Sequence, residues 1–226
     1  MVKFELLYSV LRVLHREGVL GECVLIVSWC QDFYRQMFGN PFQIPAATTT
    51  DADLLIPKKM RFNKPVDISA IMEQNGFVVE HDPLSGLSRF MHEDFKFEFL
   101  SEAGAKADEP VYRFKNLNLT TQELHFMNIP LSYNFKYQFR DIEIRLPEPE
   151  AFALHKLIVS QRRTETAKRE KDIAAAQGLL EYFENKESHV KRLHQIFSDF
   201  PKSWQKKVNE ALKKTGISLP DLRLGT

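Results

Sequence analysis

The chain has 226 residues, of which 43% are hydrophobic and 27% charged, and its formal net charge is +1. This length can bury a core as one large domain or two small ones, and the composition is typical of a globular protein. The near-zero net charge excludes a global basic field that would attract nucleic acid or a membrane. Basic residues nevertheless gather after Pro147, while the preceding part is more acidic. This asymmetry suits an anionic ligand.

The cysteines and the hydropathy pattern indicate a cytoplasmic protein. Cys23 and Cys30 are the only two cysteines, too few for a disulfide framework or a zinc site, so we expect reduced core residues. The N-terminal segment is amphipathic rather than continuously apolar, and no run of about 18 apolar residues occurs. We therefore expect neither a secretion signal nor a membrane-spanning segment.

The first part of the chain predicts a helix, a strand and a second helix. Apolar residues at helical spacing, a short fully apolar run and a second helical pattern predict these elements in turn. Their ranges are 3–17, 23–27 and 32–38. Where the strand runs directly into the helix, the turn Val27-Ser28-Trp29 offers backbone N–H groups that stabilise phosphate oxygens, and Ser28 adds a hydroxyl donor. Ser28 is equally suited to a plain helix cap.

The next predicted strand begins with two carboxylates, Asp51 and Asp53, followed by Leu54-Leu55-Ile56. Side chains two residues apart on a strand point to the same side of the sheet. Two like charges held this close repel each other unless a cation lies between them, and Mg²⁺ or Mn²⁺ is the natural occupant of an all-oxygen site. The alternative is a strand edge with two solvated acids.

A third acid, Glu98, lies in the predicted strand 94–101, where aromatic residues alternate with Asp94, Lys96 and Glu98. We place Glu98 late in this strand, near the carboxyl end where ligands gather in such sheets. If the two strands are neighbours, Asp51, Asp53 and Glu98 converge and can hold a pair of metal ions. The alternative is that Glu98 belongs only to the polar face of an amphipathic strand.

The remaining pattern predicts an α+β fold, in which a mixed sheet with flanking helices precedes a helical bundle. The boundary is Pro147-Glu148-Pro149, which divides the chain into domains 1–146 and 147–226. Before it we expect a helix over 66–74 and strands over 77–80, 87–91, 131–137 and 139–146. After it we expect helices over 149–162, 165–184, 188–198 and 201–215.

The first helix after the boundary places Lys156 on a partly apolar face, between Phe152 and Val159. Because lysine is rarely buried without a partner, an acid or a phosphate should meet it. Asp172, on the next helix, is the obvious protein partner. Either Lys156 and Asp172 form a structural pair that joins two helices, or Lys156 contacts a triphosphate and Asp172 orients it.

Together these features resemble the polymerase-β-like nucleotidyltransferase superfamily. The resemblance lies in the strand-to-helix turn at Ser28, the Asp51-Ala52-Asp53 strand and Glu98 on a later strand. The segment from Leu146 to Asp172, with His155-Lys156-Leu157 and Lys171-Asp172, is similar to the signature of bacterial nucleotidyltransferase-like proteins, a group that includes the abortive-infection toxin type. The resemblance covers residues 20 to 185, approximately.

The resemblance implies a nucleotidyltransferase-like domain over 1–146 and an enzyme that binds ATP or another nucleoside triphosphate. Asp51, Asp53 and Glu98 would be the catalytic, metal-binding residues, with Mg²⁺ or Mn²⁺ as cofactor. Ser28, Trp29, Lys156 and Asp172 would bind the nucleotide, and the acceptor hydroxyl could belong to RNA, a protein or a small molecule. The family turn has glycine where this chain has Val27. A Cβ at that position obstructs phosphate binding, so the alternative is a degenerate nucleotide-binding or interaction module.

Overall fold

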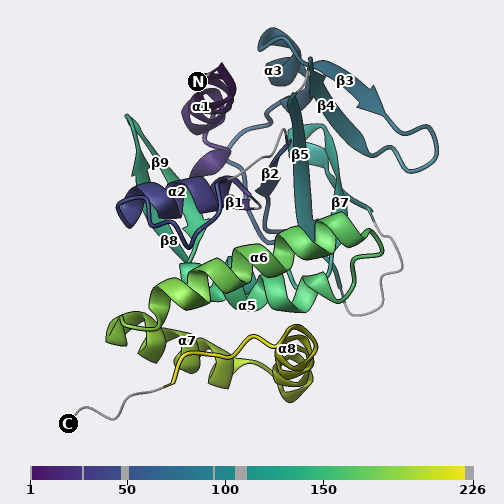
Figure 1. Ribbon diagram of the computed structural model, residues 1–226. Coiled ribbons are helices and arrows are strands. Elements are labelled where there is room, and N and C mark those ends of the chain that lie inside the picture. Colours follow the sequence, from purple (N-terminus) through teal and green to yellow (C-terminus); the bar gives the residue numbers. More distant parts are fainter. Residues whose placement is uncertain (1, 27, 47–50, 94, 105–110, 222–226) are drawn as a thin grey trace. The chain divides into compact units, whose positions relative to one another are not determined.

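The computed structural model describes residues 2–26, 28–46, 51–93, 95–104 and 111–221. They form two compact units (Figure 1). The sheet unit comprises Met1–Cys30 and Thr48–Pro147, and the helical unit comprises Gln31–Ala47 and Glu148–Thr226. The division into domains 1–146 and 147–226 stays a prediction. The compact units differ from it because residues 31–47 group with the C-terminal helices.

The sheet unit is a mixed sheet with helices. Its strands have the order β3-β4-β5-β2-β1-β9-β8, and β7 pairs with both β5 and β6. The strands are β1 (Val24–Ile26), β2 (Asp51–Leu55), β3 (Val78–His81), β4 (Ser88–His92), β5 (Phe95–Glu102), β6 (Val111–Phe114), β7 (Leu119–Leu124), β8 (Asn134–Phe139) and β9 (Ile142–Pro147). The helices are α1 (Val2–Arg16), η1 (Leu20–Glu22), α3 (Ile68–Gln74), η2 (Lys115–Leu117) and α4 (Asn128–Ser132).

Strand β2 lies inside the sheet, antiparallel to β1 and parallel to β5. One face of β2 and β5 is apolar and buried, through Ala52, Leu54, Phe97 and Phe99. On the opposite face, charged residues come first along each strand, and Leu55 of β2 and Leu100 of β5 follow them. The apolar part belongs to a buried cluster of Val24, Ile26, Leu55, Leu100 and Met127. The hydrophobic core therefore fixes the strands and leaves the polar residues at one end of this face.

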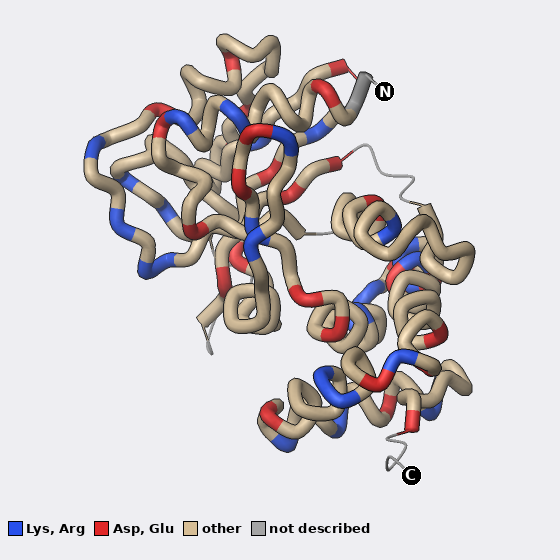
Figure 2. The backbone as a smooth tube through the Cα atoms, turned by 90° about the vertical axis from the view of Figure 1, so that its left-hand side faces the viewer, with Lys and Arg blue, Asp and Glu red and all other residues tan. Residues whose placement is uncertain are grey.

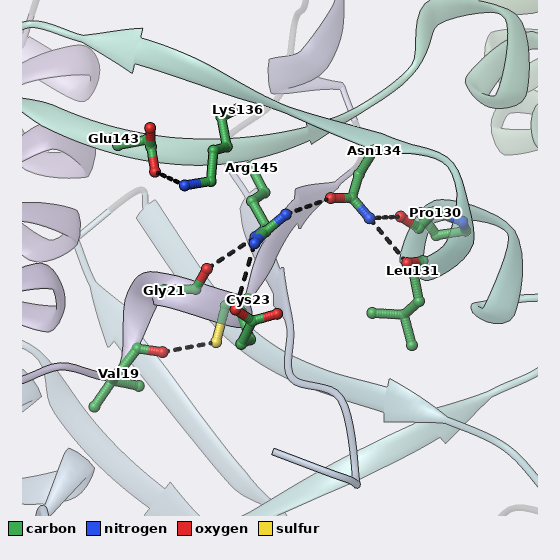
Figure 3. Close-up of polar contacts among 10 residues, drawn as sticks. Val19, Gly21, Cys23, Pro130, Leu131, Asn134, Lys136, Glu143 and Arg145 are labelled. Carbon is green, nitrogen blue, oxygen red and sulfur yellow. Dashed lines mark hydrogen bonds and ion pairs between the residues drawn. The ribbon is translucent and has the colours of Figure 1, made fainter. Parts of the chain in front are cut away.

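Arg145 of β9 anchors η1, the short helix that leads into β1 (Figure 3). Its guanidinium donates to the carbonyl oxygen of Gly21 at 2.9 Å, to Asn134 Oδ1 at 3.2 Å and to Glu22 Oε1 at 3.3 Å. Since Val24 of β1 pairs with Arg145 in the parallel β1–β9 register, these bonds reinforce a short strand contact. They hold the start of β1 beside β9.

The helical unit contains α5 (Pro149–Ser160), α6 (Thr166–Phe183), α7 (Glu187–Asp199) and α8 (Lys202–Thr215), with α5 and α6 side by side (Figure 1). Helix α2 (Trp29–Met37) begins in the sheet unit and continues here. Its Tyr34 ring packs edge-on against Phe152, with centroids 5.5 Å apart. Gly178 lies where a Cβ would come within 2.1 Å of the Gln43 carbonyl oxygen, so α6 needs glycine there to pack closely against the backbone.

The α+β class, with a mixed sheet followed by helices, is confirmed. The predicted strand over 131–137 is wrong at its start, because residues 128–132 form α4. The side-chain amide of Asn134 donates to the carbonyl oxygens of Pro130 and Leu131, and these bonds satisfy the end of a short helix (Figure 3). Strands β6 and β7 were not predicted from the sequence. None of the helices described here is long and apolar enough to cross a bilayer.

Candidate active site

The register of β2 and β5 brings the predicted acids together on one face of the sheet. Asp53 pairs with Glu98 and Asp51 pairs with Lys96 in this parallel register. Paired residues on adjacent strands are about 4.8 Å apart and point to the same side. The two strands are therefore neighbours, which was the condition for the three acids to converge. We call Asp51, Asp53, Lys96 and Glu98 the acidic face.

The acidic face lies at a different end of the strands from the one we predicted. Glu98 is the fourth residue of β5, in the first half of the strand, and Asp51 is the first residue of β2. The prediction of a site near the carboxyl end of β5 is therefore wrong. The reason is that β5 continues to Glu102 and β2 begins at Asp51, so the acids lie toward the beginning of both parallel strands, beside the end of β1.

The carboxylates of the acidic face differ in exposure. Asp51 is exposed, whereas Asp53 is 9% exposed. Glu98 is partly exposed and its Oε1 lies 2.7 Å from Lys96 Nζ. The alternation with aromatic residues predicts Lys96 on the polar side of this strand, but its ion pair with Glu98 could not be predicted from the pattern. The face therefore combines three acids with one base, and the exposure of these side chains ranges from buried at Asp53 to exposed at Asp51.

Trp29 fixes the beginning of β2. Its indole N–H donates to the Asp51 carbonyl oxygen at 2.8 Å, and the residue is only 3% exposed. The ring packs edge-on against Phe4 at 4.8 Å and against Phe95 at 6.2 Å between centroids. Trp29 thus connects α2, α1 and β5 to the backbone of the first acid. Its predicted nucleotide contact stays a prediction.

Ser28 is half-buried and follows β1 directly before α2. The β1–β2 register pairs Ile26 with Asp53, so the chain leaving β1 continues toward the start of β2. This places Ser28 at the same end of the sheet as the acidic face. Val27, the departure from the family turn, lies outside the described residues.

The acidic face has the chemistry of a site for a hard divalent cation. Three carboxylates on one sheet face provide an all-oxygen donor set of the kind that Mg²⁺ and Mn²⁺ prefer. Across the described ranges, however, no three His, Cys, Asp or Glu residues are grouped in a way that could hold a metal ion. The convergence of Asp51, Asp53 and Glu98 on one point therefore stays a prediction.

A second ionic cluster, the Asp172 cluster, lies within the helical unit. Asp172 Oδ1 accepts from Lys156 Nζ at 2.5 Å, and Asp172 Oδ2 accepts from Arg163 Nε at 2.8 Å. Burial opposes ionisation of Asp172, but the charges and hydrogen bonds of Lys156 and Arg163 outweigh it and hold its pKa below the usual value. The predicted partnership of Lys156 with Asp172 is therefore present. It connects α5 with α6.

His155, beside Lys156, is not equipped for acid–base work. Burial, assisted by the positive charge of Lys156, lowers its pKa to about 3. Its Nε2 is buried and has no hydrogen-bond partner within the described residues. The imidazole is therefore neutral near pH 7 and serves the packing of α5.

Comparison with known proteins identifies the family. The sequence matches the nucleotidyltransferase family over residues 5–198, so the chain belongs to this family. A search of curated proteins found no match.

Two solved structures are similar over nearly the whole chain. One is the solution structure of the antibiotic-resistance factor ANT(2'')-Ia, at 14% identity and a TM-score of 0.49, covering 94% of this chain and 95% of the other. The second is a nucleotidyltransferase-like protein from Paracoccidioides brasiliensis, at 12% identity and a TM-score of 0.43, covering 92% of each chain. At this identity neither similarity assigns a substrate.

Proposed function

We propose that the protein transfers a nucleoside monophosphate from a nucleoside triphosphate to an acceptor hydroxyl, with the help of Mg²⁺ or Mn²⁺. The observation that supports this most is the β2–β5 register. It pairs Asp53 with Glu98 and places Asp51 two residues before Asp53 on the same face. Membership of the nucleotidyltransferase family supports the reaction class. RNA, a protein and a small molecule all remain candidate acceptors.

The acids have separate proposed roles. Asp51 and Asp53 would hold the cation, and Glu98 would complete the donor set and accept the proton of the acceptor hydroxyl. When bound, the divalent ion neutralises charge on the triphosphate and lowers the pKa of the acceptor hydroxyl. The acceptor oxygen then bonds to the α-phosphorus, the bond to the bridging oxygen breaks, and pyrophosphate leaves.

The phosphates would be held by the beginning of α2. The first N–H groups of a helix lack partners within the helix, and its dipole favours anions there. Ser28 would add a hydroxyl donor. Trp29 would act through its hydrogen bond to the Asp51 carbonyl oxygen, which holds the first acid in place.

Lys156 and Asp172 are proposed nucleotide contacts only because of the family resemblance. Their burial and their shared ion pair favour a structural role. A bacterial, cytoplasmic setting likewise rests on the resemblance and on two buried cysteines that form no disulfide with each other.

The proposal is tested by incubating the purified protein with each α-³²P nucleoside triphosphate, Mg²⁺ and, separately, total RNA, a protein extract and a small-molecule extract. Label should appear in one acceptor fraction, and it should disappear with EDTA or in Asp53→Asn. Glu80→Gln, on the exposed strand β3, is the matched control and should keep the activity. Tight nucleotide binding without transfer to any acceptor would contradict the enzyme and favour the degenerate binding module.

A further inference from the structure

Among the four described residues of the acidic face, Lys96 is the one base. It stands directly opposite Asp51 in the register, two residues before Glu98 on the same strand. Side chains two residues apart on a strand share a face and lie about 7 Å apart at their Cα atoms. The ammonium can therefore reach the acids from within the face itself.

The ammonium is engaged with one of these acids. Lys96 Nζ lies 2.7 Å from Glu98 Oε1, and the two side chains are 30% and 25% exposed. This partial burial screens the charges less than full exposure would. The acid that the proposed function assigns to the cation and to proton transfer therefore already has a cationic partner from the chain.

We propose that Lys96 is a positioning residue that competes with a divalent cation for Glu98. The inference rests on the proposed function, because it assumes that the cation binds at the acidic face. Two cations cannot share one carboxylate oxygen without repelling each other. A cation that binds Glu98 Oε1 must therefore displace the ammonium. Lys96 thus weakens the affinity of the protein for the metal alone.

The displaced ammonium has a natural second partner. A nucleoside triphosphate brings phosphate oxygens to the same end of the sheet, and a lysine pairs readily with them as a point charge. Metal and nucleotide then bind cooperatively. The metal frees the Lys96 ammonium to pair with the phosphates, and the phosphates stabilise the ammonium once it has left Glu98. Lys96 thereby favours loading of the metal together with the substrate.

The test is a titration of the full chain with Mn²⁺ in the absence of nucleotide. The electron paramagnetic resonance signal of free Mn²⁺ reports how much of the metal is bound. Lys96→Met should bind Mn²⁺ about fivefold more tightly than the unmodified protein, the factor expected from a partly exposed ion pair of about 1 kcal/mol. Lys96→Arg keeps the charge and should keep the original affinity. Lys136→Met removes a comparable lysine, whose Nζ lies 2.8 Å from Glu143 Oε1 on β9 (Figure 3), and should change nothing.

A double-mutant cycle with Glu98→Gln shows whether the gain acts through Glu98. The gain from Lys96→Met should vanish in the Glu98→Gln background, whereas a general charge effect would persist and overturn the inference. Unchanged Mn²⁺ affinity in Lys96→Met would also overturn it. If Lys96→Met leaves the Mn²⁺ affinity unchanged but Asp53→Asn abolishes Mn²⁺ binding, the inference about Lys96 is overturned and the proposed function is retained. Absence of Mn²⁺ binding in all variants would overturn both proposals.

Discussion

The two ionic clusters of this protein are built from the same kinds of side chain in opposite proportions. In the helical unit, Asp172 is 4% exposed and is held by two bases, Lys156 and Arg163. On the acidic face of the sheet unit, three acids lie on the same side of the sheet as one base, Lys96, which pairs with Glu98. In the first cluster, both carboxylate oxygens of Asp172 are paired with basic side chains of the chain itself. The second contains more acids than bases among the four residues that define it.

This difference separates a structural cluster from a candidate binding site. A buried carboxylate with two cationic partners has satisfied its charge, and removing a partner costs stability. Carboxylates that outnumber their bases at an accessible position can bind a cation from solution. Acidic and basic residues are otherwise interspersed along both units (Figure 2), so the local balance matters more than the net charge.

The largest expected effect comes from removing one charge of the acidic face. Asp53→Asn keeps the size of the buried side chain but loses a ligand, so nucleotidyl transfer should fall about 10³-fold. The rate of label transfer measures this, and thermal unfolding checks that the fold survives. An activity within tenfold of the original would show that Asp53 has no catalytic role.

In the helical unit the same kind of change should act on stability. Lys156→Met leaves Asp172 buried with Arg163 alone, and the free energy of unfolding should fall by about 3 kcal/mol. Lys168→Met, in the exposed pair with Glu165, is the control and should cost less than about 0.5 kcal/mol. Urea titration measures both. Equal losses in the two variants would contradict the view that the Asp172 cluster is a structural core element.

The Asp172 cluster also predicts a pH dependence. Since the pKa of Asp172 is lower in the folded state, its contribution to stability is present above the unfolded value of about 3.9 and is lost as pH falls through the folded value. The stability difference between the unmodified protein and Asp172→Asn should therefore shrink below about pH 4. A difference that is constant from pH 7 to pH 3 would contradict the ion pairs.

A smaller effect is expected at the support of the acidic face. Trp29→Phe keeps the packing against Phe4 and Phe95 but removes the N–H that bonds to the Asp51 carbonyl oxygen. Unfolding free energy should fall by about 1 kcal/mol, and Mn²⁺ affinity should weaken by a few fold. Mn²⁺ affinity that is unaffected by Trp29→Phe would show that this bond does not position Asp51.

The sequence was informative where local pattern decides the structure. Helical spacing located α1 and the four C-terminal helices, and alternation placed Lys96 and Glu98 on one side of their strand. Which ends of the strands meet could not be predicted, because the antiparallel β1–β2 pairing depends on distant packing. Helix α4 was missed because its end is satisfied by the Asn134 side chain rather than by a local cap signal. The Lys96–Glu98 ion pair likewise needs side-chain positions.

Calorimetric titration with nucleoside triphosphates, in Mg²⁺ and then in EDTA, tests the account most directly. The proposed cation site at Asp51, Asp53 and Glu98 predicts that at least one triphosphate binds in Mg²⁺, and that this binding is lost both in EDTA and in Asp53→Asn. Binding of equal strength in all three cases, or no binding of any triphosphate by the unmodified protein, would contradict it.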